Sequence, residues 1–356
     1  MPAVICRAAG SCAVEDLELR PLGRHDVLVR IDASGICRSD VSLFDGSSGG
    51  ELPVVLGHEG SGTVAAVGED AARLRVGDRV VLAAIAPCGL CWACARGEPY
   101  LCAEVRRRSS PAFVDASGPV RGASGLGTLA DALVLDARTA VPVESDLPAE
   151  QLAVIGCAVV TGAGSVLNIA ATRPGDRVLV IGAGGVGLAA IQAAAASSAD
   201  VIAAVDPSAA ARTVAKACGA THVADPSAAT LDEELLAPTD GRGFDSALDC
   251  VGATSTFELA FRLTRRGGHV VVIGVAHAGV AVPVPLAQIP LSGRRISGCV
   301  YGGTSVHRDI PKYVAMAETG RIDLDQLVGR TIGLHEAPGV IVAGDIGPAR
   351  TVVVNR

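Results

Sequence analysis

The sequence predicts an α/β protein that combines a doubly wound parallel sheet with a β-rich domain. Between residues 159 and 300, apolar strands alternate with helical stretches, which is typical of βαβ units and a parallel sheet. A glycine-rich turn follows the first of these strands. Residues 1–158 instead hold short β-type runs separated by Gly, Pro and Asp. We therefore expect two domains in this chain of 356 residues.

The order of these blocks predicts that one domain is inserted into the other. Residues 301–356 return to a mixed character and end in an apolar strand, Thr351–Val354. We therefore expect residues 1–158 and 301–356 to form one domain and residues 159–300 to form the second. Alanine-rich stretches fit the helices of the second domain, because alanine has the highest helix propensity. The strands expected there are Arg177–Ile181, Val201–Val205, Ala247–Cys250 and His269–Ile273.

Charge and hydropathy narrow the range of partners. The net charge is −7 and no long basic run is present, which argues against nucleic acid as the main partner. The first ten residues lack the basic and apolar regions of a signal peptide, so we expect a cytoplasmic protein. The most apolar long run, Val178–Ala196, is interrupted by four glycines and predicts a strand, a loop and a buried helix rather than a membrane span.

The segment GAGGVG at residues 182–187 matches the dinucleotide-binding pattern G-x-G-x-x-G. It follows an apolar strand and opens a helix, which is the context that this pattern requires. The first glycine permits a tight turn, the second lets the backbone approach a pyrophosphate, and the third lets helix and strand pack closely. The helix N-terminus then presents free N–H groups to the phosphate charge. We expect a Rossmann domain whose cofactor contacts include Gly182, Gly184, Gly185, Val186 and Gly187.

An acidic residue, Asp206, ends the next strand, nineteen residues after Gly187. A carboxylate there accepts hydrogen bonds from the adenosine ribose hydroxyls and repels a 2′-phosphate, so NAD is favoured over NADP. The alternative is a glycine-rich turn that binds nothing and an aspartate that faces solvent.

The chain has eleven cysteines, and four of them crowd into fifteen residues with the spacing C-x2-C-x2-C-x7-C. In a protein without an export signal, metal ligation is a better interpretation of this count than disulfides. Four close thiolates can surround one tetrahedral ion and leave no open position, which makes the site structural. An iron–sulfur cluster and ordinary buried cysteines are the alternatives. We expect a structural zinc ion bound by Cys88, Cys91, Cys94 and Cys102.

Three separate segments carry further metal-ligand candidates: Cys37 in GICRSD, His58 in GHE, and Cys157 just before the βαβ block. A lone cysteine usually packs in a core, and a lone histidine is more often a satisfied polar residue than a ligand. Together the three supply two thiolates and one imidazole. Such a set leaves a fourth tetrahedral position open, which a catalytic zinc ion requires.

These motifs give the sequence a resemblance, over essentially its whole length, to the zinc-containing medium-chain alcohol dehydrogenase family. GHE followed by G-x5-G, here Gly57 to Gly68, is that family's zinc signature. The segments GICRSD, the four cysteines, GCAVVTG, GAGGVG and GPARTVV occur in the family's order. Two cysteines and one histidine are the known catalytic zinc ligands of alcohol dehydrogenases. The resemblance implies a Rossmann domain and a β-rich, GroES-like catalytic domain.

The resemblance implies a role for each matching residue around the catalytic zinc. Cys37, His58 and Cys157 would bind the ion. Asp40 resembles the carboxylate that orients the ligand histidine. Glu59 would lie behind the metal and exchange transiently with bound water. The hydroxyl of Ser39 resembles the group that takes the alcohol proton.

The resemblance also implies the cofactor contacts and the reaction. Arg38 and Arg350 resemble the cationic contacts to the NAD pyrophosphate, and Thr161 resembles a residue lining the nicotinamide site. The activity implied is reversible hydride transfer from a primary or secondary alcohol to NAD, in which zinc acts as a Lewis acid.

Two positions depart from the family pattern. Ser42 stands where many members carry a histidine that ends the proton relay, so the relay would run through water or ribose. Ala84 stands where an aromatic residue often narrows the substrate channel. Together with Ser48 it predicts a roomier pocket, and hence a substrate bulkier than ethanol, such as an aryl, terpenoid or other secondary-metabolite alcohol.

Other functions stay open from the sequence. A polyol or sugar dehydrogenase, a thiol-dependent formaldehyde dehydrogenase, or an atypical NAD(P)H-dependent reductase of a biosynthetic pathway would keep the fold and the metals. A non-enzymatic NAD-binding protein is disfavoured, because the zinc ligands and Ser39 are all present.

Two further features concern the surface. The basic run Arg106–Arg108, within the uninformative segment 104–127, is expected to be a solvated loop; contact with an anionic substrate or a thiol-conjugated aldehyde is the alternative. A sheet edge near Tyr301 predicts strand pairing between subunits, and by resemblance we expect a homodimer rather than a tetramer. We expect small-molecule alcohols or aldehydes as substrates, and neither nucleic acid nor membrane as a partner.

Overall fold

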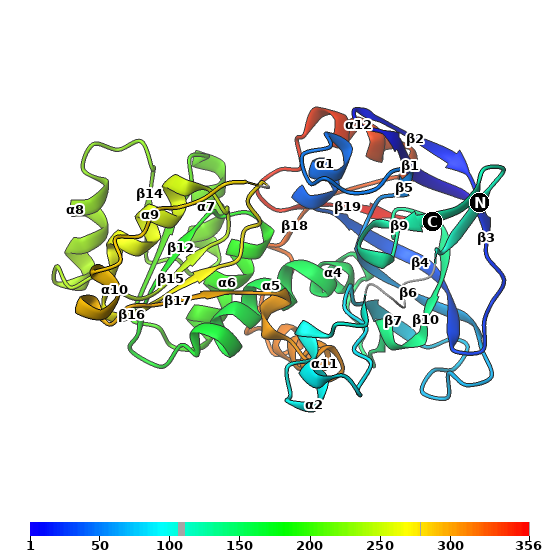
Figure 1. Cartoon of the computed structure of the whole chain (residues 1–356), viewed down its shortest axis with the longest axis horizontal. Coiled ribbons are helices and arrows are strands. Elements are labelled where there is room, and N and C mark those ends of the chain that lie inside the picture. The colour runs from blue at the N-terminus through cyan, green and yellow to red at the C-terminus, as the bar shows by residue number, and fades with distance from the viewer. Residues whose placement is uncertain (106–110, 278, 356) are drawn as a thin grey trace. The chain divides into compact units, whose positions relative to one another are not determined.

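The computed structural model describes residues 1–105, 111–277 and 279–355, so the run Arg106–Arg108 lies outside the described residues. Contacts divide the chain into two compact units, which are described separately (Figure 1). Unit 1 comprises Met1–Cys157, Ser305–Glu318 and the chain from Val328 onward. Unit 2 comprises Ala158–Thr304 and Thr319–Leu327.

The segment Thr319–Leu327 belongs to unit 2, whereas we expected all of residues 301–356 to return to the first domain. The physical reason is a pair of hydrogen bonds that joins this segment to a helix of unit 2. The side chain of Gln192 donates to the carbonyl oxygen of Asp323 at 2.9 Å and accepts from the N–H of Asp323 at 2.5 Å. Gln192 is itself buried, so these bonds replace the solvent that its amide has lost.

Unit 2 contains one sheet of six strands, all parallel, in the order β14-β13-β12-β15-β16-β17 (Figure 1). In chain order this is 3-2-1-4-5-6, the strand order of a Rossmann sheet, and the predicted fold class is confirmed. The strands are β12 (Arg177–Ile181), β13 (Val201–Val205), β14 (His222–Ala224), β15 (Phe244–Asp249), β16 (Thr264–Val272) and β17 (Arg295–Gly298).

The central strands β12 and β13 are largely apolar along both faces because helices cover the sheet. Every residue of β13 is buried, as a parallel sheet between two helical layers requires. The helices are α5 (Val160–Gly164), α6 (Gly185–Ala196), α7 (Ala209–Ala217), α8 (Leu231–Leu236), α9 (Thr254–Leu263) and α10 (Gln288–Ser292).

Unit 1 is β-rich and contains two mixed sheets. One has the order β2-β1-β5-β9-β8-β3, and the other has the order β11-β7-β6-β4-β19-β18, with β10 also paired to β4. The strands are β1 (Pro2–Ala8), β2 (Ser11–Asp16), β3 (Glu18–Leu19), β4 (Asp26–Ile36), β5 (Val54–Val55), β6 (Glu59–Val67), β7 (Arg79–Leu82), β8 (Phe113–Asp115), β9 (Gly118–Gly122), β10 (Ala132–Asp136), β11 (Ala140–Pro142), β18 (Val328–Ile332) and β19 (Arg350–Val354). The helices are α1 (Arg38–Phe44), α2 (Trp92–Ala95), α4 (Ala149–Val154), α11 (Val306–Glu318) and α12 (Ala337–Ala343).

Three strands of the second sheet position candidate site residues. The last strand, β19, pairs antiparallel with β4, so that Thr351 lies opposite Ile36. On its other side β4 pairs with β6, which places Gly35 opposite Glu59. The ends of β4, β6 and β19 therefore lie together, although β19 comes from the C-terminal end of the chain.

One helical run was not predicted from the sequence. Residues Ala149–Ala170 form a continuous apolar helix in which π-helical turns at Ile155–Val159 and Ser165–Ala170 interrupt the α-helical geometry. By length and composition alone this helix could cross a membrane, but 72% of its most apolar window is buried inside the protein. That degree of burial is typical of a core helix.

Candidate functional site

Asp40, in the first turn of α1, joins two segments that carry predicted metal ligands. One oxygen accepts the backbone N–H of Cys37 at 2.9 Å, and the other accepts the backbone N–H of Gly57 at 2.8 Å. Asp40 has no solvent exposure, and its carboxylate faces the N-terminus of α1, where negative charge is favourable. The carboxylate therefore fixes the distance between Cys37 and the residue that follows Gly57.

Gly57 must be glycine for two reasons. Its φ is +93°, in the region that side chains rarely adopt, and a Cβ at this position would overlap the backbone nitrogen of Leu129. The carbonyl of Gly57 also accepts the N–H groups of Gly127 and Thr128, at 3.1 and 3.0 Å. This tight turn directs the next residue, His58, into the interior.

Ligand atoms of Cys37, His58, Glu59 and Cys157 all lie within 4.8 Å of one another. The first three are buried, and Cys157 is half-buried in the π-helical turn Ile155–Val159. Nδ1 of His58 lies 3.4 Å from a carboxylate oxygen of Asp40 and makes no hydrogen bond to the residues that the structure describes. Two thiols, an imidazole and a carboxylate converging in a buried space are the donor set of a zinc ion, so these residues fit the predicted metal.

Arg350, at the start of β19, forms an ion pair with Glu59 of this cluster. The guanidinium Nε donates to both carboxylate oxygens of Glu59 at 3.0 Å, and Nη2 donates to Sγ of Cys37 at 3.4 Å. Burial opposes the charge of Arg350, but the negative groups of Cys37 and Glu59 raise its pKa. We predicted a role for each of Arg350 and Glu59, but not this contact between them.

The two thiols of the cluster differ in acidity. A hydrogen bond from Cys157, and then the charge of Arg350, hold the pKa of Cys37 well below its usual range despite burial. The same hydrogen bond, together with burial, raises the pKa of Cys157 well above its usual range. Cys37 is therefore the more acidic thiol of the pair, and a metal ion that binds both sulfur atoms as thiolates displaces their protons.

The remaining residues predicted for this centre lie on α1 and nearby loops. Ser39 is exposed, and its Oγ lies 3.8 Å from Sγ of Cys37. Arg38 is also exposed, so neither residue is committed to the core. The carbonyl of Ser42 accepts the N–H of Ser48 at 3.0 Å, and Ala84 is half-buried beside the core of unit 1.

The four cysteines Cys88, Cys91, Cys94 and Cys102 form a second cluster, whose sulfur atoms lie within 4.8 Å of one another. Backbone N–H groups of Leu90 and Cys91 donate to Sγ of Cys88 at 3.4 and 3.2 Å. Such bonds favour the thiolate, and they lower the pKa of Cys88. The lobe has little apolar core of its own, since Leu90 and Trp92 are 86% and 72% exposed. These observations fit a lobe that an ion organises.

Sequence reasoning missed Arg138, which lies near this lobe. It forms an ion pair with Asp136. The hydrogen bond within this pair, together with the charges of Cys88 and Cys102, raises the pKa of Arg138. Four thiolates around a divalent ion leave two negative charges, which a nearby guanidinium offsets. No spacing pattern in the sequence links Arg138 to the cysteines, so only the fold identifies it.

The glycine-rich turn of unit 2 has the geometry that its spacing predicted. A Cβ on Gly187 would overlap the carbonyl oxygen of Gly182, whereas a Cβ on Gly184 would meet no atom within 4 Å. The first hydrogen bond of α6 runs from Leu188 N–H to Gly184 O, which leaves the N–H groups of residues 185–187 free of intrahelical partners. The open space at Gly184 and these N–H groups form a cradle that fits a phosphate.

Asp206 follows β13 and is half-buried beside this turn. One oxygen accepts the N–H of Ala183 at 2.8 Å, and the other accepts the N–H of Ser208 at 2.8 Å. The carboxylate is thus held at the glycine-rich turn. Thr161, the other residue predicted for the cofactor in this unit, is half-buried on α5.

Comparison with known proteins covers nearly the whole chain. The family "Alcohol dehydrogenase GroES-like domain" matches residues 23–145, and the family "Zinc-binding dehydrogenase" matches residues 185–319. A geraniol dehydrogenase of Castellaniella defragrans is 34% identical over 92% of this chain and 90% of its own length. An S-(hydroxymethyl)glutathione dehydrogenase of Komagataella pastoris is 31% identical over 92% of this chain and 89% of its own length.

Solved structures share this fold over the whole length of the chain. The crystal structure of benzyl alcohol dehydrogenase from Acinetobacter calcoaceticus superposes with a TM-score of 0.92 at 29% identity. The match covers 100% of this chain and 99% of that one. Both units of the present structure therefore have counterparts in a single known chain.

Proposed function

The chain belongs to the zinc-containing medium-chain alcohol dehydrogenase family, and we propose that it is an NAD-using enzyme that oxidises a bulky primary or secondary alcohol. The observation that carries this proposal is the convergence of Cys37, His58 and Cys157. The neighbouring Glu59 forms an ion pair with Arg350. Two thiolates and an imidazole are three ligands of a tetrahedral ion, and the fourth position is left for substrate. Glu59 does not compete for that position while both its oxygens accept hydrogen bonds from Arg350.

The bound groups would supply the chemistry that side chains lack: zinc acts as a Lewis acid toward the alcohol oxygen, and NAD accepts the hydride. The protein's part is to hold the ligands and move a proton. Ser39 is exposed and lies beside Cys37, so its hydroxyl is suited to accept the alcohol proton. With Ser42 in place of a histidine, the proton would continue to solvent through water or the ribose.

The glycine-rich turn and Asp206 support NAD as the cofactor. The cradle at Gly184 suits the pyrophosphate, and the carboxylate of Asp206 suits the ribose hydroxyls. Contacts from Arg38, Arg350 and Thr161 to the cofactor stay predictions. Arg38 is free to make such a contact, whereas Arg350 would have to share its guanidinium with Glu59.

Small side chains at Ser48 and Ala84 support a bulky substrate, and relatives named for geraniol and benzyl alcohol are compatible with it. A thiol-dependent formaldehyde dehydrogenase is the second candidate, because several relatives are S-(hydroxymethyl)glutathione dehydrogenases. A series of kcat/KM values separates the two. We expect benzyl, cinnamyl or terpenoid alcohols to exceed ethanol by at least about tenfold, which needs only about 1.4 kcal/mol of extra transition-state binding. A preference for the glutathione adduct of formaldehyde would favour the second candidate.

The test of the metal-dependent activity uses two variants. Cys157→Ala should lose one of two zinc ions and nearly all NAD reduction, while it still binds NADH. Cys218→Ala is the control, because this thiol is buried, lies far from both clusters in sequence and belongs to unit 2. Full activity of Cys157→Ala, or loss of activity without loss of zinc, would contradict the proposed role.

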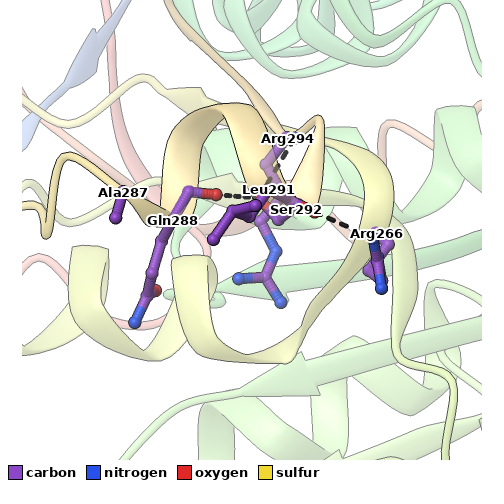
Figure 2. A pocket seen from close by; sticks show the side chains of 6 residues that line it. All are labelled: Arg266, Ala287, Gln288, Leu291, Ser292 and Arg294. Atoms are coloured by element: carbon purple, nitrogen blue, oxygen red, sulfur yellow. Dashed lines mark hydrogen bonds between the residues drawn. The ribbon is translucent and has the colours of Figure 1, made fainter.

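We also propose a homodimer formed through the edge strand β17. Among the described strands of its sheet, β17 pairs only with β16. Nearby apolar side chains are exposed: Leu286 at 83%, Leu291 at 72% and Ile296 at 41%. Figure 2 shows Leu291 of α10 among the residues that line a pocket, which also include Arg266 and Arg294. An open strand edge flanked by exposed apolar groups favours pairing with a second copy.

Light scattering tests the dimer. Ile296→Lys should halve the mass, because a buried lysine would oppose strand pairing, whereas Val76→Lys, at an exposed position of unit 1, should leave the mass unchanged. A monomeric wild-type protein would refute this proposal. We further propose the cytoplasm as the compartment, since the chain has eleven free cysteines, six of them in the two metal-ligand clusters, and such thiols require reducing conditions.

A further inference from the structure

Two cysteines outside both metal clusters lie opposite each other in the first hairpin of unit 1. Cys6 on β1 and Cys12 on β2 are register partners, and both are free thiols. We propose that Cys6 and Cys12 form a reversible disulfide that closes the β1–β2 hairpin under oxidising conditions. Neither thiol belongs to the two metal-ligand clusters.

The hydrogen-bond pattern shows which type of cross-strand pair this is. Val4 donates its N–H to Leu129 at 2.8 Å and accepts the N–H of Leu56 at 2.9 Å, so its main-chain groups point away from β2. These directions alternate along a strand, so Cys6, two residues further, has the same orientation as Val4. Cys6 and Cys12 are therefore a non-hydrogen-bonded pair. Such pairs have Cα atoms about 4.5 Å apart, within the range of about 4.4–6.8 Å that disulfides span.

The two side chains also lie on the same face of the sheet, as directly opposite residues do. Cys6 is fully buried in a cluster with Val41 and Phe44 of α1, and Cys12 packs against the same cluster while half-buried. One thiol is thus sheltered, and its partner is accessible to a reagent from solvent. That arrangement suits entry of an oxidant at Cys12 and resolution by Cys6.

Closing the hairpin would affect the helix that carries Ser39 and Asp40. The hairpin turn contacts the end of α1, where the N–H of Gly10 donates to the carbonyl of Phe44 at 2.6 Å. A disulfide across the hairpin restricts local opening of this turn. It would therefore hold the C-terminal end of α1 against β1 without touching the residues at its N-terminal end.

The oxidant is a low-molecular-weight disulfide such as glutathione disulfide. The Cys12 thiolate attacks one of its sulfurs and expels a glutathione thiolate. The Cys6 thiolate then attacks Sγ of Cys12 and expels the second. Two electrons pass from the protein to the glutathione disulfide, and the two thiol protons leave to the released glutathione.

Peptide mapping of the full-length, zinc-loaded enzyme tests the proposal. The protein is equilibrated at pH 8.5 in glutathione buffers from fully reduced to fully oxidised, then denatured with N-ethylmaleimide and digested with trypsin. Cleavage after Arg7 separates the two cysteines, so the disulfide would join peptide 1–7 to peptide 8–24. We expect this linked species to appear with oxidation and to vanish on reduction.

Two variants and one further measurement complete the design. Cys12→Ser should abolish the linked species, and Cys218→Ser, a buried thiol elsewhere, should not. Hydrogen exchange of residues 8–12 should slow by about tenfold or more in the oxidised enzyme, as expected for closing a short loop. Recovery of both peptides alkylated at the most oxidising ratio, a stable glutathione adduct on Cys12 alone, or linkage of either cysteine to another residue would each overturn the proposal.

Discussion

The guanidinium of Arg350 lies 2.8 Å from the carboxylate of Glu59, although 291 residues separate the two in sequence. Both side chains are buried, at 6% and 0% exposure. A buried charge that loses its partner is costly, because neither water nor another residue can replace it. This contact therefore ties the last strand of the chain to the metal centre.

Removing the guanidinium should destabilise unit 1 strongly. We expect Arg350→Met to lower the free energy of unfolding by about 3–5 kcal/mol, since Glu59 is left buried and unpaired. The double variant Arg350→Met/Glu59→Gln should recover part of this loss. Urea unfolding of the four proteins in a double-mutant cycle measures the coupling, and additive effects would show that the pair does not act as a unit.

The four-cysteine lobe should depend on its ion. We expect Cys94→Ala to bind one zinc ion per chain instead of two, because three thiolates no longer close a tetrahedral shell. Trp92, the only tryptophan of the chain, lies in this lobe, so its fluorescence anisotropy should fall as the lobe loosens. Metal analysis that still finds two zinc ions would refute the assignment.

Substitution by alanine should affect different properties at two glycines of the dinucleotide turn: stability at Gly187 and cofactor affinity at Gly184. Gly187→Ala places a methyl group against the carbonyl of Gly182 and should cost about 2–3 kcal/mol of stability. Gly184→Ala has room for the methyl group, so stability should change by less than about 0.5 kcal/mol. The same methyl group fills the phosphate cradle, and we expect NADH affinity to fall at least about tenfold. Urea unfolding and NADH titration of both variants distinguish these outcomes.

Cofactor choice should depend on the charge of Asp206. Asp206→Asn keeps an oxygen that can accept the N–H of Ala183, but it loses the hydrogen bond from Ser208 and removes the negative charge. We expect the kcat/KM ratio of NAD to NADP to fall by about tenfold or more, because a 2′-phosphate is no longer repelled. An unchanged ratio would mean that another residue discriminates between the two cofactors.

Stability should fall in mild acid partly because of His269. Burial, and then the charge of Arg295, lower the pKa of His269 below its usual range. Above the unfolded pKa of about 6.5 the histidine is neutral in both states and costs nothing. As the pH falls below that value, the unfolded chain gains a proton that the folded chain does not, so stability is lost progressively. His269→Gln should reduce the slope of stability against pH between 7 and 5, as measured by urea unfolding across that range.

The sequence allowed the local parts of the fold to be predicted. The strands expected at Arg177–Ile181 and Val201–Val205 coincide with β12 and β13, because continuous apolar runs bounded by Gly and Asp are unambiguous. Residues expected to bind metal were identified by spacing or by resemblance, and the structure brings each set together. In these cases the signal lies within a short stretch of chain.

Features that depend on distant contacts could not be predicted. The pairing of β19 with β4, the contact of Arg350 with Glu59 and the position of Thr319–Leu327 in unit 2 all join segments more than 100 residues apart. The long helix Ala149–Ala170 was missed because its glycines and β-branched residues have low helix propensity, and burial overrides that preference. Arg138 was missed for the same reason as the contact between Arg350 and Glu59, because the pairing of opposite charges leaves no local sequence pattern.

The carboxylate of Asp40 makes this position unusually intolerant of substitution. Both of its oxygens accept a backbone N–H, one from each ligand-bearing segment. Asparagine has the right length but would turn an NH2 group toward one of these donors, and glutamate would extend the group into space that the buried site lacks. Neither asparagine nor glutamate can therefore connect the two ligand-bearing segments. A residue that need not touch the ion thus constrains where the ion can bind.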